Sequence, residues 1–222
     1  MKEIFKNTTH IGFDLDGTLY PYTAEIQNRV KDEIAKKVLD KKPELNSIDN
    51  ARKFLEEKYK ELESTTKIMA YLGYENPSKA MDECLAKADI LDLLKKDKVL
   101  EKIIKELAQA YTLYLITGSP EDLTIKKLEK IGINPDYFKL KVYSDTPGAG
   151  LKFDGDAFNF IIKKSNAPPS CHVYIGDRPN TDILPSKKLG MKTIAVGDIK
   201  EADIQIKEIH EIKGLFIPSS QS

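Results

Sequence analysis

Residues 10–18 read HIGFDLDGT, an apolar run that ends in two aspartates and a glycine. Asp14 and Asp16 are two positions apart, so in extended backbone their side chains lie on one face while the residue between them points the other way. Gly17 permits a tight turn and the close approach of a ligand. A hairpin turn is the alternative, because Asp-Gly is a common turn dipeptide. No pairing strand follows, and we therefore interpret this segment as a functional loop at the end of a strand.

Four further apolar runs follow along the chain, and helical patterns separate the last four of the five. The predicted strands cover residues 10–13, 112–116, 140–143, 172–175 and 192–196. Strands that alternate with helices are typical of βαβ units and a parallel sheet. The predicted fold class is therefore α/β, with a Rossmann-like parallel sheet as its core. Before the second strand, we expect Val99, Ile103 and Leu107 to form the buried stripe of a helix.

The interval between the first two strands breaks this rhythm, since it contains only helical patterns. The predicted helices cover residues 24–39, 51–72 and 78–90, the last one after Pro77. This interval is too long for a single crossover helix. We therefore predict an α/β core of residues 1–19 and 98–222, and an all-helical subdomain of residues 20–97 inserted after the first strand. Residues 218–222 are expected to fray.

Composition and charge argue against several classes of protein. The chain of 222 residues has 35 basic and 35 acidic side chains, whereas proteins that bind a nucleic-acid backbone usually carry a basic excess. No apolar run approaches the roughly 18 residues of a membrane helix, and the beginning of the chain shows no apolar signal segment. Two cysteines are too few for a disulfide framework. We expect a cytoplasmic protein that binds neither a nucleic-acid polymer nor a membrane.

Three of the predicted strands end in small, polar or acidic residues. The carboxyl ends of the strands in an open parallel sheet line the ligand crevice, so these residues should meet there. Asp182 also has a structural interpretation, as the cap of the next helix. The residues at the three strand ends are Asp14 and Asp16, then Thr117 and Gly118, then Asp177 and Asp182.

These segments resemble, in the same order, the motifs of the haloacid dehalogenase superfamily of phosphatases. DLDGTL at 14–19 is similar to the first motif, LITG at 115–118 to the second, and YIGD at 174–177 to the fourth. Lys152 resembles the lysine of the third motif, with Phe153 and Gly155 where prolines are usual. The helical insertion is similar to the family's first type of cap. FDLDGTLY at 13–20 looks most like the pyrimidine 5′-nucleotidase branch.

The resemblance implies a Mg²⁺-dependent phosphatase that hydrolyses a small phosphorylated metabolite through an aspartyl-phosphate; in the branch named above the substrate is a nucleoside 5′-monophosphate. Asp14 would be the nucleophile and Asp16 the general acid and base. The phosphate would be bound by Thr117, Gly118 and Lys152. The ligands of the metal would be Asp14, the backbone carbonyl of Asp16, and Asp177, with Asp182 orienting them. If an aromatic side chain stacks on a nucleobase, Tyr20 is the first candidate.

Charge counting also predicts a metal at this site. The four aspartates face one ammonium group, that of Lys152, which leaves three net negative charges. Such a site would repel a phosphate dianion. A divalent cation that prefers oxygen ligands, Mg²⁺ above all, reduces the excess to one charge, and protonation of Asp16 removes that one.

Other functions stay open at the level of sequence. A phosphomutase would use the same aspartyl-phosphate and return the phosphoryl group to a sugar. A dehalogenase is disfavoured because a departing halide needs no proton from Asp16. A signalling receiver domain, or another phosphate-binding protein without turnover, is disfavoured by the insertion and by the presence of both Asp14 and Asp16. The sequence predicts neither the individual substrate nor the oligomeric state.

Overall fold

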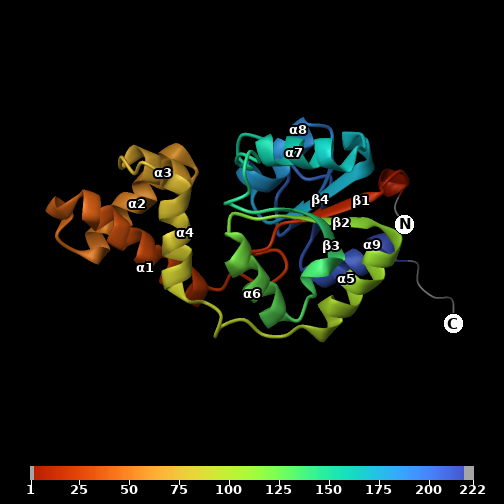
Figure 1. Ribbon diagram of the computed structural model, residues 1–222, viewed down its shortest axis with the longest axis horizontal. Helices are drawn as coiled ribbons and strands as arrows, with labels where there is room; N and C mark the ends of the chain where they lie inside the picture. Colours follow the sequence, from red (N-terminus) through yellow and green to blue (C-terminus); the bar gives the residue numbers. More distant parts are fainter. Residues whose placement is uncertain (1–2, 218–222) are drawn as a thin grey trace. The chain divides into compact units, whose positions relative to one another are not determined.

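A six-stranded sheet organises the computed structural model, which describes residues 3–217 (Figure 1). All of its strand pairs are parallel, in the order β3-β2-β1-β4-β5-β6. The α/β fold class and the five predicted strands are confirmed, and the predicted fraying of 218–222 lies outside the described residues. A short edge strand, β6, was not predicted. The strands are β1 His10–Phe13, β2 Thr112–Ile116, β3 Phe138–Val142, β4 His172–Gly176, β5 Lys192–Val196 and β6 Ile204–Ile206.

The strand order places a topological switch point beside β1. The chain runs from β1 outward through β2 to β3, and then returns to β4 on the other side of β1. Phe13 is in register with Leu115 of β2 and with Ile175 of β4. Connections on the two sides of a switch point diverge and leave a crevice at the carboxyl ends of the strands. The loops after β1, β2 and β4 therefore begin at one level of the sheet.

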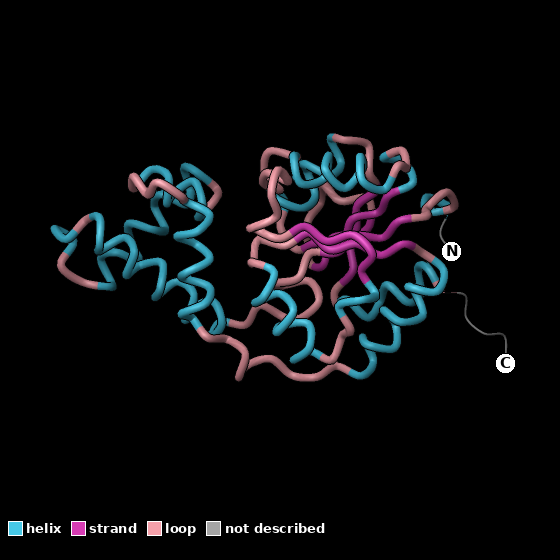
Figure 2. Tube along the Cα trace, in the orientation of Figure 1, coloured by secondary structure: helices cyan, strands magenta, loops and turns pink. Residues whose placement is uncertain are grey.

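Helices cover both faces of the sheet, as Figures 1 and 2 show. On one face lie α7 (Asp156–Ser165) and α8 (Leu184–Lys188), and on the other lie α5 (Lys98–Ala110), α6 (Glu121–Ile131) and α9 (Ile212–Phe216). The central strand is therefore buried on both sides, with Ile11 and Phe13 fully inaccessible.

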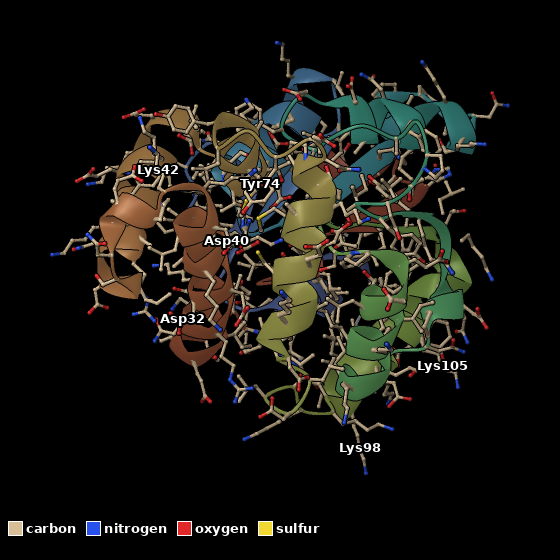
Figure 3. All side chains as sticks on the ribbon, turned by 60° about the vertical axis from the view of Figure 1, so that its left-hand side comes forward. Asp32, Asp40, Lys42, Tyr74, Lys98 and Lys105 are labelled. Carbon is tan, nitrogen blue, oxygen red and sulfur yellow. The ribbon has the colours of Figure 1, made fainter. Side chains whose placement is uncertain are left out.

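The buried stripe of α5 contains two of the three predicted residues, Ile103 and Leu107, but not Val99. Val99 is 62% exposed, whereas Leu100 is fully buried together with Ile104 and Leu107. The prediction for Val99 is wrong because the first turn of the helix, capped by Asp97, turns position 99 outward. Figure 3 shows the labelled Lys98 and Lys105 projecting from this helix into solvent.

Residues 22–93 form a compact unit separate from the unit of 1–21 and 94–222. The units join at 21–22 and 93–94, where the predicted boundaries were 19–20 and 97–98. None of the described helices of either unit is long and apolar enough to cross a membrane. The α-helices of the 22–93 unit are α1 Ala24–Lys41, α2 Ile48–Leu62, α3 Thr65–Tyr71 and α4 Pro77–Ala88.

The predicted single helix over 51–72 is wrong, because it is two helices, α2 and α3. Glu63 adopts a left-handed conformation with a φ of 53° and ends α2. Ser64 then caps α3, and its side chain accepts a hydrogen bond from the backbone N–H of Lys67. Neither Glu63 nor Ser64 is a glycine or proline, and the periodic pattern of apolar residues continues across both. The apolar pattern therefore did not indicate the break.

Polar contacts connect the helices of this unit at its surface. The Nε of Arg52 on α2 donates to Oδ1 of Asp32 on α1 at 2.7 Å. The hydroxyl of Tyr74, between α3 and α4, donates to the backbone carbonyl of Lys37 at 2.7 Å. Figure 3 labels Asp32 and Tyr74. These contacts tie α2 and the α3–α4 connection to α1.

Candidate active site

The loop after β1 carries the first two aspartates and brings one of them against β4. The backbone N–H of Asp14 donates to the carbonyl of Ile175 at 2.9 Å, which continues the pairing of β1 with β4. Gly17 has a φ of 94°, and a Cβ at this position would clash with the carboxylate of Asp177. Gly17 is therefore required for two reasons: it adopts this positive φ without strain, and it leaves room for the carboxylate of Asp177.

Three carboxylates form a cluster at the carboxyl ends of β1 and β4. One oxygen from each of Asp14, Asp177 and Asp182 lies within 4.8 Å of the others. Asp182 is fully buried on the π-helical turn η5 (Pro179–Ile183), and its Oδ2 accepts from the backbone N–H of Arg178 at 3.1 Å. A Cβ on Gly176 would clash with Asp182, so a glycine at the end of β4 allows this turn to fold back.

Lys152 neutralises part of the cluster. Its Nζ lies 2.5 Å from Oδ1 of Asp14 and 2.6 Å from Oδ1 of Asp182. Burial acts to lower the pKa of Lys152, but the charges of the two aspartates outweigh it and raise the pKa above its usual value. The turn that carries Lys152 closes without the usual prolines, because the N–H of Gly155 donates to the carbonyl of Lys152 at 3.0 Å.

The acidic cluster favours protons when no cation is bound. Burial raises the pKa of Asp14 to about 7, against the opposing charge of Lys152 and with support from the neighbouring aspartates. Burial and the charge of Asp182 raise the pKa of Asp177 to about 6. Bound cations displace protons from such groups, and a set of carboxylate oxygens suits a hard divalent ion. The residues present therefore fit Mg²⁺.

The side chain of Asp16 lies outside this cluster and is held by a second set of donors. Oδ1 accepts from Nζ of Lys127 at 2.6 Å and from the hydroxyl of Tyr20 in a short hydrogen bond. Oδ2 accepts from Oγ of Ser119 at 3.3 Å. Burial acts to raise the pKa of Asp16, but the charge of Lys127 and the hydrogen bonds from Lys127 and Tyr20 outweigh it, so the pKa is lowered.

The loop after β2 lies next to Asp16. Thr117 is buried, and its Oγ1 accepts from the backbone N–H of Ser119 at 3.2 Å. A Cβ on Gly118 would meet no heavy atom within 4 Å, so the backbone of Gly118 borders open space. The loop thus places the open space at Gly118 next to Ser119, which contacts the carboxylate of Asp16.

Comparison with known proteins gives the family of the chain. The chain matches the family model of the haloacid dehalogenase-like hydrolases over residues 8–190. It belongs to this family. A glyceraldehyde 3-phosphate phosphatase of Methanocaldococcus jannaschii is 35% identical to it over 109 residues, which is 47% of this chain and about half, 47%, of that protein. The resemblance found in the sequence is thereby confirmed at the level of the family, while the pyrimidine 5′-nucleotidase branch stays a prediction.

Solved structures of haloacid dehalogenase-like proteins share the fold over nearly the whole chain. A HAD phosphatase from Thermococcus onnurineus has a TM-score of 0.64 and 19% identity, covering 94% of this chain and 97% of its own. A β-phosphoglucomutase from Clostridium difficile has a TM-score of 0.63 and 18% identity, covering 95% of each chain. At these identities the likeness concerns the fold alone.

The predicted site residues lie in two neighbouring groups. Asp14, Asp177, Asp182 and Lys152 form one, and Asp16 belongs to the other. Thr117 is linked to the second group through Ser119. Tyr20 is 6% exposed with its hydroxyl on Asp16, so little of its ring is left for stacking on a base.

Sequence reasoning missed Lys127, Ser119 and the hydroxyl of Tyr20 as partners of Asp16. The side chain of Lys127 is fully inaccessible on α6, on the buried face that also carries Leu123 and Ile131. A lysine four residues from each of two buried apolar positions was the signal available in the sequence. The charge count was wrong for the same reason: it left out Lys127, and the positive charge of Arg178 also acts on Asp16 and Asp177.

Proposed function

We propose that this hydrolase is a Mg²⁺-dependent phosphatase that cleaves a small phosphomonoester through an aspartyl-phosphate on Asp14. The observation that carries the proposal is the cluster in which Asp14 contacts Lys152 at 2.5 Å and adjoins two further carboxylates. The name of the relative from Methanocaldococcus jannaschii, a glyceraldehyde 3-phosphate phosphatase, supports a phosphate ester as the substrate.

In the proposed reaction, a carboxylate oxygen of Asp14 attacks phosphorus in line as the bond to the leaving oxygen breaks. Asp16 protonates the leaving oxygen, and in the second half-reaction takes a proton from the water that hydrolyses the aspartyl-phosphate. Backbone N–H groups at Gly118, the hydroxyl of Thr117 and the ammonium of Lys152 stabilise the charge on the phosphoryl oxygens.

The protonation of Asp16 has to change during this cycle. In the free site its pKa is lowered, so Asp16 is held as the base that the second half-reaction needs. A bound phosphate ester places negative charge close to this carboxylate, and a like charge raises the pKa of a carboxyl group. Substrate binding therefore favours the acid form that the first half-reaction needs.

The metal would be held by Asp14, the backbone carbonyl of Asp16, and Asp177. Bound there, Mg²⁺ would supply positive charge that lets a phosphate dianion approach the carboxylates. Asp182 suits an orienting role, because Lys152 and the N–H of Arg178 already occupy its two oxygens.

The test is a phosphate-release screen with Mg²⁺ over nucleoside 5′-monophosphates, triose phosphates, sugar phosphates and phosphoglycolate. We expect release from at least one class, and its loss on Asp14→Asn, whose amide is a poor nucleophile of nearly the same shape. Circular dichroism would verify that the variant is folded. Phosphate release by Asp14→Asn at the wild-type rate would remove Asp14 as the nucleophile, and isomerisation of a sugar phosphate without release would identify a mutase instead.

A further inference from the structure

Lys127 carries a positive charge in a fully inaccessible place. Its side chain has an exposed fraction of 0% on α6, on the same face as buried leucine and isoleucine side chains. Burying an ammonium group is expensive unless it is well paired, and a methionine would fill such a position without that cost. The burial of Lys127 therefore requires an explanation from its partners.

Both polar partners of Lys127 belong to the environment of Asp16. Nζ lies 2.6 Å from Oδ1 of Asp16 and 2.8 Å from Oγ of Ser119. Ser119 in turn lies 3.3 Å from Oδ2 of the same carboxylate. Lys127 thus reaches one oxygen of Asp16 directly and the other through Ser119, and the hydroxyl of Tyr20 adds a third donor.

These donors come from separate parts of the chain. Lys127 is on α6, Ser119 follows β2, and Tyr20 lies in the loop between β1 and α1. Three converging donors fix the orientation of a carboxylate, because rotating it would break at least one hydrogen bond. Proton transfer in catalysis requires such fixed geometry within hydrogen-bond reach of the reacting atom.

We propose that Lys127 is a positioning residue, which holds the carboxylate of Asp16, directly and through Ser119, in the orientation for proton transfer to the leaving oxygen and from the attacking water. This inference rests on the proposed function. The side chain of Lys127 is inaccessible, so in this proposal it acts through Asp16 and not on the substrate.

The inference predicts an effect that depends on the leaving group. An alkyl phosphate needs a proton on its leaving oxygen, whereas p-nitrophenolate leaves without one. Lys127→Met should lower kcat for an alkyl phosphate by about 10- to 100-fold, with little change in KM. With p-nitrophenyl phosphate the first step should be far less affected. Hydrolysis of the aspartyl-phosphate still needs the base, so rapid mixing should reveal a burst of nitrophenolate.

Two further variants of α6 serve as controls. Lys127→Arg keeps the charge and the donors and should recover part of the lost rate. Lys126→Met changes the adjacent lysine, whose side chain is 57% exposed and pairs with Asp122 at 3.5 Å, and it should match the wild type with both substrates.

The outcomes separate this inference from the proposed function. Wild-type protein that hydrolyses neither p-nitrophenyl phosphate nor any ester of the phosphate-release screen overturns the proposed function and this inference with it. Active wild-type protein combined with equal losses for both esters, or no loss, in Lys127→Met overturns the positioning role alone. If Lys127→Met does not fold, Ser119→Ala decides the question, because it removes one bridging hydroxyl; wild-type behaviour of this variant with both esters would also overturn the role.

Discussion

At the scale of single residues, Asp14 and Asp16 lie in different environments although they are two positions apart. Asp14 adjoins two carboxylates and has a raised pKa, whereas Asp16 faces a buried lysine and has a lowered pKa. The sequence predicted that both would be functional, since their spacing puts them on one face. It could not predict their environments, because Lys127 is 111 positions from Asp16 along the chain.

Replacement of Asp16 by Asn tests its role in both half-reactions. Turnover of an alkyl phosphate should fall by about 10²- to 10⁴-fold, because the donor for the leaving oxygen is gone. With p-nitrophenyl phosphate the first step should survive and the aspartyl-phosphate should accumulate. Rapid mixing should then show nitrophenolate approaching one equivalent of enzyme before a slow steady state. Equal losses for both esters without a burst would exclude Asp16 as the acid and base.

The same replacement should also destabilise the fold, because it leaves the ammonium of Lys127 buried without its carboxylate. Breaking a buried ion pair by removing one partner costs about 3–5 kcal/mol. The double variant Asp16→Asn/Lys127→Met removes both charges and should recover most of this loss. Urea unfolding of the wild type, both single variants and the double variant measures the coupling. A double variant no more stable than Asp16→Asn would contradict the pairing.

At the scale of elements, the sequence predicted strands better than the limits of helices. β1, β2 and β4 are largely apolar runs that are buried almost throughout, whereas β3 alternates apolar residues with Lys139 and Lys141. β6 has only three residues, two of them apolar, too short for a recognisable pattern. The break between α2 and α3 was missed because the apolar pattern continues across it. The helix ends at Glu63 through its left-handed backbone conformation, and glutamate has no preference for turns.

The left-handed residue at this break offers a test of the element. Glu63 has a φ of 53°, a conformation that glycine adopts without strain. Glu63→Gly should raise the free energy of unfolding by about 0.5–1 kcal/mol. The matched control is Glu57→Gly, which places glycine at an exposed position in the interior of α2 and should lower the free energy of unfolding by about 1 kcal/mol. Chemical denaturation of both variants is the measurement, and destabilisation by Glu63→Gly would contradict the assigned conformation.

At the scale of the whole molecule, the described strands and all the proposed catalytic residues lie in one unit of the chain. The unit of residues 22–93 contributes only helices within its described elements. We therefore expect that residues 1–21 and 94–222, joined by a short Gly-Ser linker in place of 22–93, still fold. Generic ester hydrolysis should persist and discrimination between phosphate esters should be lost. A joined protein that shows no cooperative unfolding would contradict this division, and one that retains the wild-type substrate preference would exclude a selective role for the helical unit.

Protons and Mg²⁺ should compete for the same carboxylates, and the binding of either should stabilise the folded protein. The pKa values of Asp14 and Asp177 are raised to about 7 and about 6, so the folded state binds protons more tightly than the unfolded state. The stability that these groups contribute is therefore fully present below their unfolded pKa values, near 4, and is lost as the pH rises through 7. At pH values where Asp14 and Asp177 are ionised, Mg²⁺ should bind their carboxylates and restore the stability that was lost with the protons.

Thermal unfolding with and without Mg²⁺, at pH 8 and at pH 5.5, tests this linkage. At ten times its Kd, a ligand that binds only the folded state adds about 1.4 kcal/mol, a rise in Tm of about 3–5 °C for a chain of this size. We expect this rise at pH 8 and a much smaller one at pH 5.5, where protons compete for Asp14 and Asp177.

The rise should vanish in Asp177→Asn and persist in Asp122→Asn, which removes an exposed carboxylate of α6. Potassium chloride at the same ionic strength controls for screening, since a general salt effect would raise Tm equally in both variants. An equal rise at the two pH values would show that Mg²⁺ does not bind the carboxylates that hold these protons.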